Sequence, residues 1–229
     1  SLSNRVDLRQ YDAREAEYLT IVKQYAPEEL AQFPELFAML IEIMELEMGD
    51  HLGTLYHTLE LQNQQVGQFF TPYHVCVTMA LMTVQDAPAL MEQKGYISVM
   101  EPCVGAGAMV LAVADALCQQ GINYQTALHA TAVDIDITAV HMAYIQLSLY
   151  HIPARIIHGD SLRMTAWSEW LTPAHVMGFW DARMRRLDSE AAVPGPQGIT
   201  AYPMLPALPA APAVPDARPT PRAQQLTLF

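Results

Sequence analysis

The chain has 229 residues, of which 52% are hydrophobic, and a formal net charge of −12. This length fits one sizeable domain, and the apolar fraction is enough to form a core. Proteins that hold DNA without help carry a basic face, because neutralised phosphates supply most of the affinity. The acidic balance therefore argues against autonomous tight DNA binding. The densest basic cluster is Arg183, Arg185 and Arg186.

Signals for a membrane or an oxidising compartment are not found. No apolar run approaches the ~20 residues of a membrane span, and the first residues do not form a signal peptide. The cysteines Cys76, Cys103 and Cys118 lack the paired spacing of a zinc site or a disulfide framework. We therefore expect buried free thiols, no metal and a cytoplasmic location.

Residues 1–62 are predicted to form a helical N-terminal region, with helices over residues 10–25, 34–49 and 51–62. In the second helix, apolar residues follow the three-and-four spacing of an amphipathic helix. We interpret its methionine-rich stripe as core packing. The stripe consists of Leu36, Met39, Leu40, Ile43 and Met44.

A turn over residues 66–72 is expected to lead into a helix over about 72–85. Thr71 is predicted to cap this helix, and Pro72 fits its first position. Phe69 and Phe70 have two interpretations. Either both rings fill the core, or one of them lies against a flat ring of a ligand.

Residues 97–109 are predicted to form a strand, a tight turn and the start of a helix that ends near residue 121. Gly105 and Gly107 carry no Cβ, so the backbone of the turn can approach a ligand closely. Free N–H groups at the helix start can donate to a polar or anionic group.

Two further strands, over residues 128–136 and 154–160, each end in carboxylates: Asp134 and Asp136 after the first, and Asp160 after the second. Three strand ends that carry acids indicate an α/β domain with a nucleoside-containing ligand along the carboxyl edge of its sheet. The glycine turn is not a full G-x-G-x-x-G. This favours a ligand smaller than a dinucleotide, such as S-adenosylmethionine.

Five segments together resemble the adenine-specific DNA methylases of type I restriction–modification systems. Those enzymes carry, in order, the elements D-x-L-G-x-x-Y, G-Q-F-Y-T-P, D-P-A-C-G-S-G, G-x-E-x-D and G-D-S-L. The similar segments here are residues 50–56, 67–72, 101–107, 132–136 and 159–162. The resemblance implies a Rossmann-like S-adenosylmethionine-dependent methyltransferase fold with a partial sheet, and methylation of the exocyclic amine of adenine in DNA.

The resemblance also implies which residues bind the cofactor. Phe70, Thr71 and Pro72 would lie along it, and Glu101 and Gly105 would surround its methionine end, with Gly107 in the same turn. Asp134 would bind the ribose hydroxyls. Ile135 would lie against the face of the adenine ring, and Asp160 would accept from the adenine amine.

The resemblance fails where the target base should be held. The methylases carry an Asn-Pro-Pro-aromatic tetrapeptide, whose aromatic residue stacks on the flipped base. This sequence contains none, and the nearest match by position is Thr172, Pro173 and His175. We prefer to interpret Thr172 and Pro173 as the cap of a helix over residues 174–187. Residues 167–171 are expected to be a poor fourth strand.

After a methyltransferase-like domain over residues 63–188, residues 189–224 are rich in proline and alanine and are predicted to be a linker. The final residues 225–229 resemble the peptide with which bacterial replication and repair proteins bind the sliding clamp of DNA polymerase. Leu228 and Phe229 would fill an apolar pocket there, Gln225 would form hydrogen bonds, and Leu226 belongs to the same motif.

Two functions remain open from the sequence. One is a DNA adenine methyltransferase, completed by a second methylase or specificity subunit if the missing loop comes from another chain. The other is a non-catalytic module, derived from a methylase, that acts through the sliding clamp or a DNA-modification partner.

Overall fold

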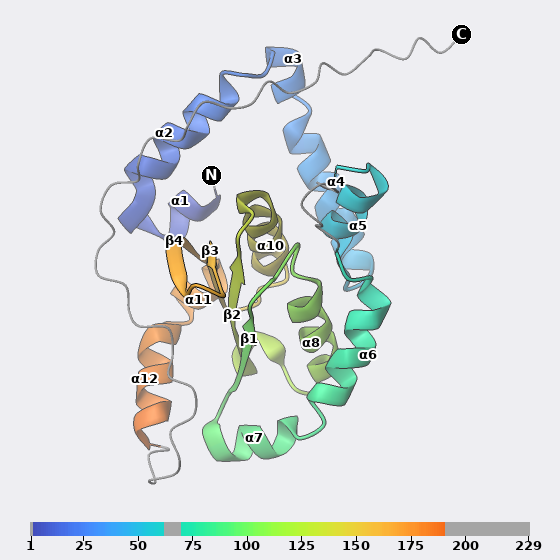
Figure 1. The fold of residues 1–229 in the computed structure, drawn as a ribbon, viewed down its shortest axis with the longest axis vertical. Helices are drawn as coiled ribbons and strands as arrows, with labels where there is room; N and C mark the ends of the chain where they lie inside the picture. Colours follow the sequence, from blue (N-terminus) through green and yellow to red (C-terminus); the bar gives the residue numbers. More distant parts are fainter. Residues whose placement is uncertain (1, 62–69, 191–229) are drawn as a thin grey trace. The chain divides into compact units, whose positions relative to one another are not determined.

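The computed structural model describes residues 2–61 and 70–190, which belong to one unit, Ser1–Gly198 (Figure 1). In this part the chain is mixed α/β, with a four-stranded sheet. In chain order the elements are α1 (Leu2–Val6), η1 (Leu8–Gln10), α2 (Tyr11–Val22), α3 (Pro27–Leu30), α4 (Phe33–Leu46), α5 (His51–Thr58), α6 (Tyr73–Thr83), α7 (Ala87–Lys94), β1 (Ile97–Glu101), α8 (Ala108–Gln119), α9 (Tyr124–Ala127), β2 (Leu128–Asp134), α10 (Ile137–Leu149), β3 (Ala154–Asp160), β4 (Thr165–Leu171), α11 (Pro173–Met177) and α12 (Trp180–Glu190).

The sheet has the order β1-β2-β3-β4. Strands β1, β2 and β3 are parallel, and β4 runs antiparallel to β3. Glu101 pairs with Ala132, and Asp134 pairs with His158, so each strand reaches two residues further than its neighbour. The three parallel strands therefore end at the same edge of the sheet, which we call the carboxyl edge.

Helices α8 and α10 pack on one face of this sheet, and α6 packs on α8 (Figure 1). Eight of the twelve residues of helix α8 are buried, because its small and branched residues can approach the strands closely. Leu111, Leu117, Leu128 and Ile156 are fully shielded from solvent. Each such aliphatic side chain contributes about 1.5–3 kcal/mol on burial, so this face holds the main core.

Side chains alternate along a strand, so His129 of β2 points to the opposite face from Leu128. There the His129 ring contacts the rings of His175 in α11 and Trp180 in α12. The chain after the sheet thus returns to cover the second face near the start of β2.

The sheet and its helices confirm most of the predicted elements, with three corrections. Residues 165–171 do form a strand, β4. The expected helix over 174–187 is two helices, because Phe179 takes a left-handed backbone conformation with φ of 49° between them. Helix α6 has Pro72 rather than Thr71 at its N-cap, and no side chain caps it.

The interpretation of the α4 stripe as core packing is wrong for most of its length. Met44 is buried and Leu40 packs against the core, but Leu36, Met39 and Ile43 are 58%, 57% and 45% exposed. The expectation of buried thiols is likewise confirmed only for Cys76, since Cys103 and Cys118 are free but exposed. Within residues 2–61 and 70–190, no helix has the length and apolarity needed to cross a membrane.

Arg14 attaches helix α2 to the sheet. Its guanidinium lies 3.9 Å from the centre of the Trp170 ring and donates to the Glu169 carbonyl at 2.5 Å. It also donates to Ser3 and pairs with Asp7 at 3.7 Å. Arg14 is only 6% exposed, so these contacts replace the water that its charge loses on burial.

Candidate functional site

The candidate site lies at the carboxyl edge, where the loop after β1 meets the end of β2. The Gly105 N–H donates to Oδ2 of Asp134 at 2.8 Å, and the Asp136 N–H donates to Oδ1 at 2.9 Å. The Val104 N–H donates to the Val133 carbonyl at 2.9 Å. The structure therefore joins the glycine turn to Asp134, as expected for one site built from both strand ends.

Phe70 lies directly on the glycine turn. Gly105 has φ of +55°, and a Cβ there would come within 2.8 Å of the Phe70 ring. Tyr56 of α5 contacts the same ring edge-on, with 5.6 Å between centroids. Only a glycine permits both this backbone conformation and this close approach. Thr71 and Pro72, which follow Phe70, are exposed.

Gly107 serves the backbone of the same turn. It has φ of +108° and forms the N-cap of α8. A Cβ there would lie 3.7 Å from the Ala143 Cα and from a Leu147 methyl group, both in α10. This glycine therefore faces a neighbouring helix, and its left-handed conformation closes the turn.

Glu101 places a second carboxyl group beside Asp134. Its Oε1 accepts from the Cys103 N–H at 3.2 Å. Burial raises the pKa of Glu101, and the negative charge of Asp134 raises it further, whereas the hydrogen bond from Cys103 lowers it. A cationic group placed between these carboxylates would relieve that cost, because an opposite charge stabilises the ionised form.

At the end of β3, Asp160 organises its own turn. Its Oδ1 accepts from the N–H groups of Leu162 and Arg163, both at 3.0 Å, and its Oδ2 lies 3.6 Å from the Arg163 guanidinium. Two apolar side chains near these acids face solvent: Ile135 is 63% exposed and Leu162 is 95% exposed. The carboxyl edge thus combines carboxylates with uncovered apolar groups, as a site for an amphipathic ring would.

Sequence reasoning missed Gln146 of α10, which is fully buried. Its Nε2 donates to Oδ1 of Asp50 and to the Ala106 carbonyl, both at 2.8 Å, and its Oε1 accepts from the Leu52 N–H at 3.0 Å. One side chain therefore holds the start of α5 to the glycine turn. A lone glutamine within an apolar helix was the available signal, since a buried amide needs several partners.

The edge of the sheet opposite the carboxyl edge, where β3 begins and β4 ends, carries Thr172, Pro173 and His175. The Thr172 N–H donates to the carbonyl of Ala154, the first residue of β3. The hydroxyl of Thr172 accepts from the His175 N–H, so Thr172 caps α11 as predicted, with Pro173 in its first turn. The structure does not bring these three residues together with Glu101, Asp134 and Asp160.

His175 belongs to a chain of polar side chains at this second edge, in which His129 and His175 are buried. Its Nδ1 lies 2.9 Å from Nε2 of His129, and its Nε2 lies 3.4 Å from Oδ1 of Asp181. Arg155 donates to the same carboxylate oxygen at 2.9 Å. Burial lowers the pKa of His129 to about 3, and burial also lowers the pKa of His175. Burial therefore favours the neutral form of both rings.

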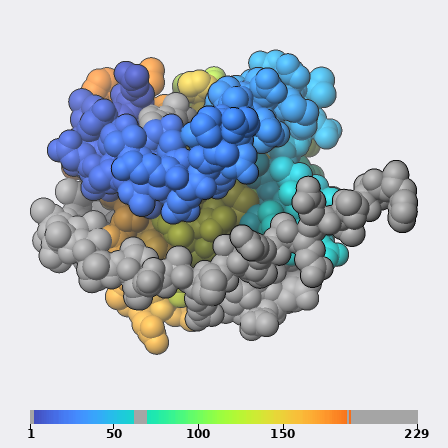
Figure 2. All heavy atoms as spheres, turned by 90° about the horizontal axis from the view of Figure 1, so that it is seen from above, coloured from blue at the N-terminus to red at the C-terminus, as the bar shows by residue number. Residues whose placement is uncertain are grey.

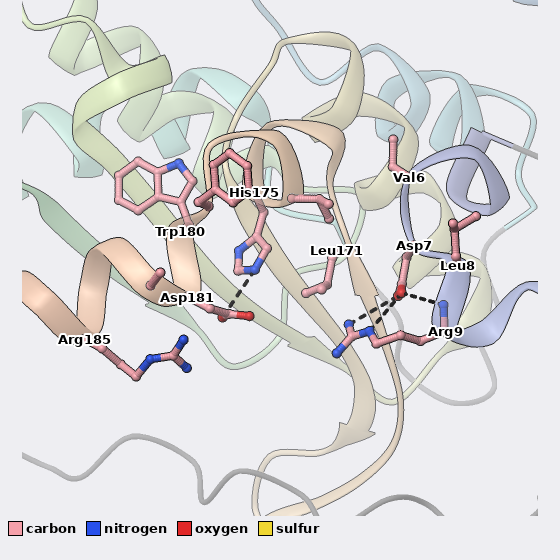
Figure 3. Close-up of a pocket in the computed structure, with 12 residues that line it drawn as sticks. Val6, Asp7, Leu8, Arg9, Leu171, His175, Trp180, Asp181 and Arg185 are labelled. Atoms are coloured by element: carbon pink, nitrogen blue, oxygen red, sulfur yellow. Dashed lines mark hydrogen bonds and ion pairs between the residues drawn. The ribbon is translucent and has the colours of Figure 1, made fainter.

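Beside this polar chain lies a groove of about 430 Å³ between the segment at η1 and helices α11 and α12 (Figure 3). Its floor is formed by the buried side chains of Leu171 and Trp180. Figure 3 shows the guanidinium groups of Arg9 and Arg185 on opposite sides of Asp181. This groove is separate from the carboxyl edge.

Several predicted residues lie outside the residues that the structure describes. These are the first part of the segment at 67–72, with Gly67, Gln68 and Phe69, and the end of the chain, with Gln225, Leu226, Leu228 and Phe229.

The chain matches a model of a known protein family. A family model described as N-6 DNA methylase matches residues 48–178, which is more than half of the chain. The match begins two residues before Asp50 and ends directly after α11. No curated protein matches the chain.

Proposed function

The chain belongs to the N-6 DNA methylase family, and on that premise we propose that it binds S-adenosylmethionine at its carboxyl edge and acts in the methylation of adenine in DNA. Members of this family depend on S-adenosylmethionine in general, and DNA is their substrate. The observation that carries the proposal is the 2.8 Å hydrogen bond from Gly105 to Asp134, which joins the glycine turn to the acid at the end of β2.

The residues of the carboxyl edge fit this cofactor. Asp134 would bind the ribose hydroxyls through lone pairs that its two backbone hydrogen bonds leave free. Ile135 would cover one face of the adenine ring, and its 63% exposure leaves an apolar surface for that contact. Asp160 would accept from the adenine amine beside it.

The methionine end would lie over the glycine turn. Glu101 would face the cationic groups there, which is consistent with a carboxyl group that burial destabilises in its charged form. Phe70 would cover this end, because its ring already lies on Gly105. Thr71 and Pro72 would lie along the cofactor, and Gly107 would keep the turn closed.

When bound, the cofactor supplies an electrophilic methyl group on its sulfonium. This methyl group would pass to the adenine amine as its bond to sulfur breaks, and the amine would lose a proton. Catalysis of this kind depends on holding the methyl group and the adenine amine in a productive geometry, which supplies a large part of the reduction in the activation barrier. The 229 residues contain no Asn-Pro-Pro-aromatic tetrapeptide to hold the amine. We therefore propose that a second methylase or specificity subunit of a restriction–modification assembly supplies this function.

The missing tetrapeptide also supports a second candidate function. In it, the chain is a non-catalytic module that keeps the methylase fold and acts through the sliding clamp, by Gln225, Leu226, Leu228 and Phe229, or through a DNA-modification partner. A clamp-bound peptide would raise the local concentration of an acidic protein at DNA without a basic face.

Calorimetric titration of S-adenosylmethionine into the purified full chain tests the cofactor site. We expect binding that Asp134→Ala abolishes and that Asp12→Ala, a change of an exposed acid in α2, leaves unchanged. Absence of binding at millimolar cofactor would overturn the site. Transfer of labelled methyl groups to DNA, alone and with cell extract, then separates the two functions: transfer in either condition supports the methylase, and none in both supports the non-catalytic module.

A further inference from the structure

Helix α4 presents an apolar stripe to solvent. Leu36, Met39, Ile43 and Leu46 follow one another at three- and four-residue spacing, so they share one side of the helix. They are 58%, 57%, 45% and 84% exposed. In Figure 2 the blue helices of the N-terminal region lie on the surface that faces the viewer. A contiguous exposed apolar stripe of this kind marks a protein-binding surface.

The charges beside this stripe restrict what can cover it. Glu35, Glu42 and Glu45 lie on the same helix, are exposed, and form no ion pair among the described residues. Residues 15–50 contain nine acids and one base, Lys23. Two copies that met stripe to stripe would bring these like charges together, which is unfavourable. The stripe therefore requires an apolar surface with basic groups at its rim.

The groove at η1, α11 and α12 has this chemistry. Leu8 and Phe179 line it and are 71% and 76% exposed, which is unusual for large apolar side chains in a concave site. Phe179 is also held with a positive φ of 49°, a conformation that is strained for a non-glycine residue. The ring is therefore presented to solvent by strained backbone.

Of the two arginines that line the groove, Arg185 is available to a partner, whereas Arg9 and the acids are already paired. Asp7 pairs with Arg9 at 3.0 Å and with Arg14 at 3.7 Å, and Asp181 pairs with Arg155 at 2.9 Å. Arg185 is exposed and has no ion pair within the part of the chain that the structure describes.

We propose that the α4 stripe of one copy of this chain docks into the groove of a second copy. Leu36, Met39 and Ile43 would cover Leu8 and Phe179, in the manner of an amphipathic helix in an apolar groove. The glutamates beside the stripe would pair with Arg185. The stripe of each copy would meet the groove of the other, and these two contacts, related by a two-fold axis, would close a dimer.

Sedimentation velocity of the full chain over a range of concentrations tests this proposal. We expect a reversible dimer in the wild type. The stripe variant, Leu36→Asp with Met39→Asp, and the groove variant, Leu8→Asp with Arg185→Glu, should each weaken it about tenfold or more, as the loss of central contacts does. The matched control is Met82→Asp, which changes a 70% exposed residue of α6 and should leave the dimer unchanged.

Mixing identifies which surfaces meet. The stripe variant keeps an intact groove, and the groove variant keeps an intact stripe, so an equimolar mixture should form more dimer than either variant alone. Unchanged circular dichroism spectra and melting temperatures would show that both variants fold. A monomeric wild type at all concentrations would overturn the proposal. So would a mixture with no more dimer than its components, because the contact would then not join stripe to groove.

Discussion

Gln146 donates a hydrogen bond to Asp50 at 2.8 Å, although the two residues are 96 positions apart in the sequence. Both side chains are buried, and the same amide nitrogen also reaches the Ala106 carbonyl in the glycine turn. This small network connects the start of α5, helix α10 and the candidate cofactor site. Removing Gln146 takes a hydrogen bond from the Asp50 carboxylate, the Ala106 carbonyl and the Leu52 N–H in a place that water does not reach.

Replacement of Gln146 by leucine should therefore destabilise the protein by about 1–3 kcal/mol, the cost of leaving buried polar groups unsatisfied. Urea unfolding followed by circular dichroism measures this. Gln125→Leu serves as the control, because Gln125 is exposed and should change stability by less than about 0.5 kcal/mol. Equal effects of both changes would contradict the role of the network.

Gly53→Ala should disrupt the cap of α5. The Asp50 carboxylate accepts from the Gly53 N–H at 2.8 Å, and a Cβ at Gly53 would come within 2.6 Å of the Asp50 Cγ. Loss of such a cap costs about 1 kcal/mol. In a double-mutant cycle with Asp50→Ala, the two losses should be clearly less than additive, because the second change removes the group that clashes. Additive losses would show that the glycine serves another purpose.

Gly105→Ala should weaken both the fold and cofactor binding. The left-handed conformation costs an alanine about 1 kcal/mol, and the new methyl group would press on the Phe70 ring. Combining it with Phe70→Leu should recover part of the lost stability but not the cofactor affinity. Thermal unfolding and calorimetric titration measure the two effects separately. Full recovery of stability would show that strain at this φ is negligible.

Stability should fall as the pH falls from 7 to 5. Burial lowers the pKa of His129 to about 3, below the value of about 6.5 in an unfolded chain, so the unfolded state binds more protons in this range. This contribution is complete above about pH 6.5 and is lost progressively as the pH falls toward about 3. Each such histidine contributes a slope of up to about 1.4 kcal/mol per pH unit.

The control for this pH effect is a matched pair of variants. His129→Leu should reduce the slope of the unfolding free energy between pH 7 and 5, whereas His74→Leu, at an exposed position, should leave it unchanged. Urea unfolding at several pH values gives the slope. An unchanged slope in His129→Leu would mean that the buried ring does not govern acid sensitivity.

The strands β1, β2 and β3 were predicted well from the sequence, because a short apolar run that ends in a carboxylate is typical of a buried parallel strand. The sequence did not predict β4, for a specific reason. The turn that joins β3 to β4 contains Met164 with φ of 55°, where glycine or asparagine is the usual signal. A further obstacle was the mixed burial of β4, which carries Trp167 at 47% exposure. Neither a turn residue nor a clean alternation marked this hairpin.

The motif residues of the candidate site were singled out from the sequence, but the buried side chain that holds them in place was not. Asp134 and Gly105 were singled out because each stands in a motif at a strand end, and the structure joins them by a hydrogen bond, while their role in cofactor binding stays a prediction. Gln146 was not found, since a single polar residue in a helix gives no information about what lies opposite. The interpretation of the α4 stripe as core packing was wrong for a different reason. Periodicity shows that a helix has an apolar side, but not whether the same chain covers that side.

The two outermost strands of the sheet, β4 and β1, differ in their surroundings. At one end of the strand order, β4 forms an antiparallel hairpin with β3, and Glu169 of β4 pairs with Arg155 of β3 at 3.6 Å. At the other end, among residues 2–61 and 70–190, β1 pairs with β2 alone. Unpaired amides on an outermost strand are a template for a foreign strand. An additional strand from another chain would therefore pair with β1. If it ran parallel to β1, its C-terminal end would lie next to Glu101 and the glycine turn.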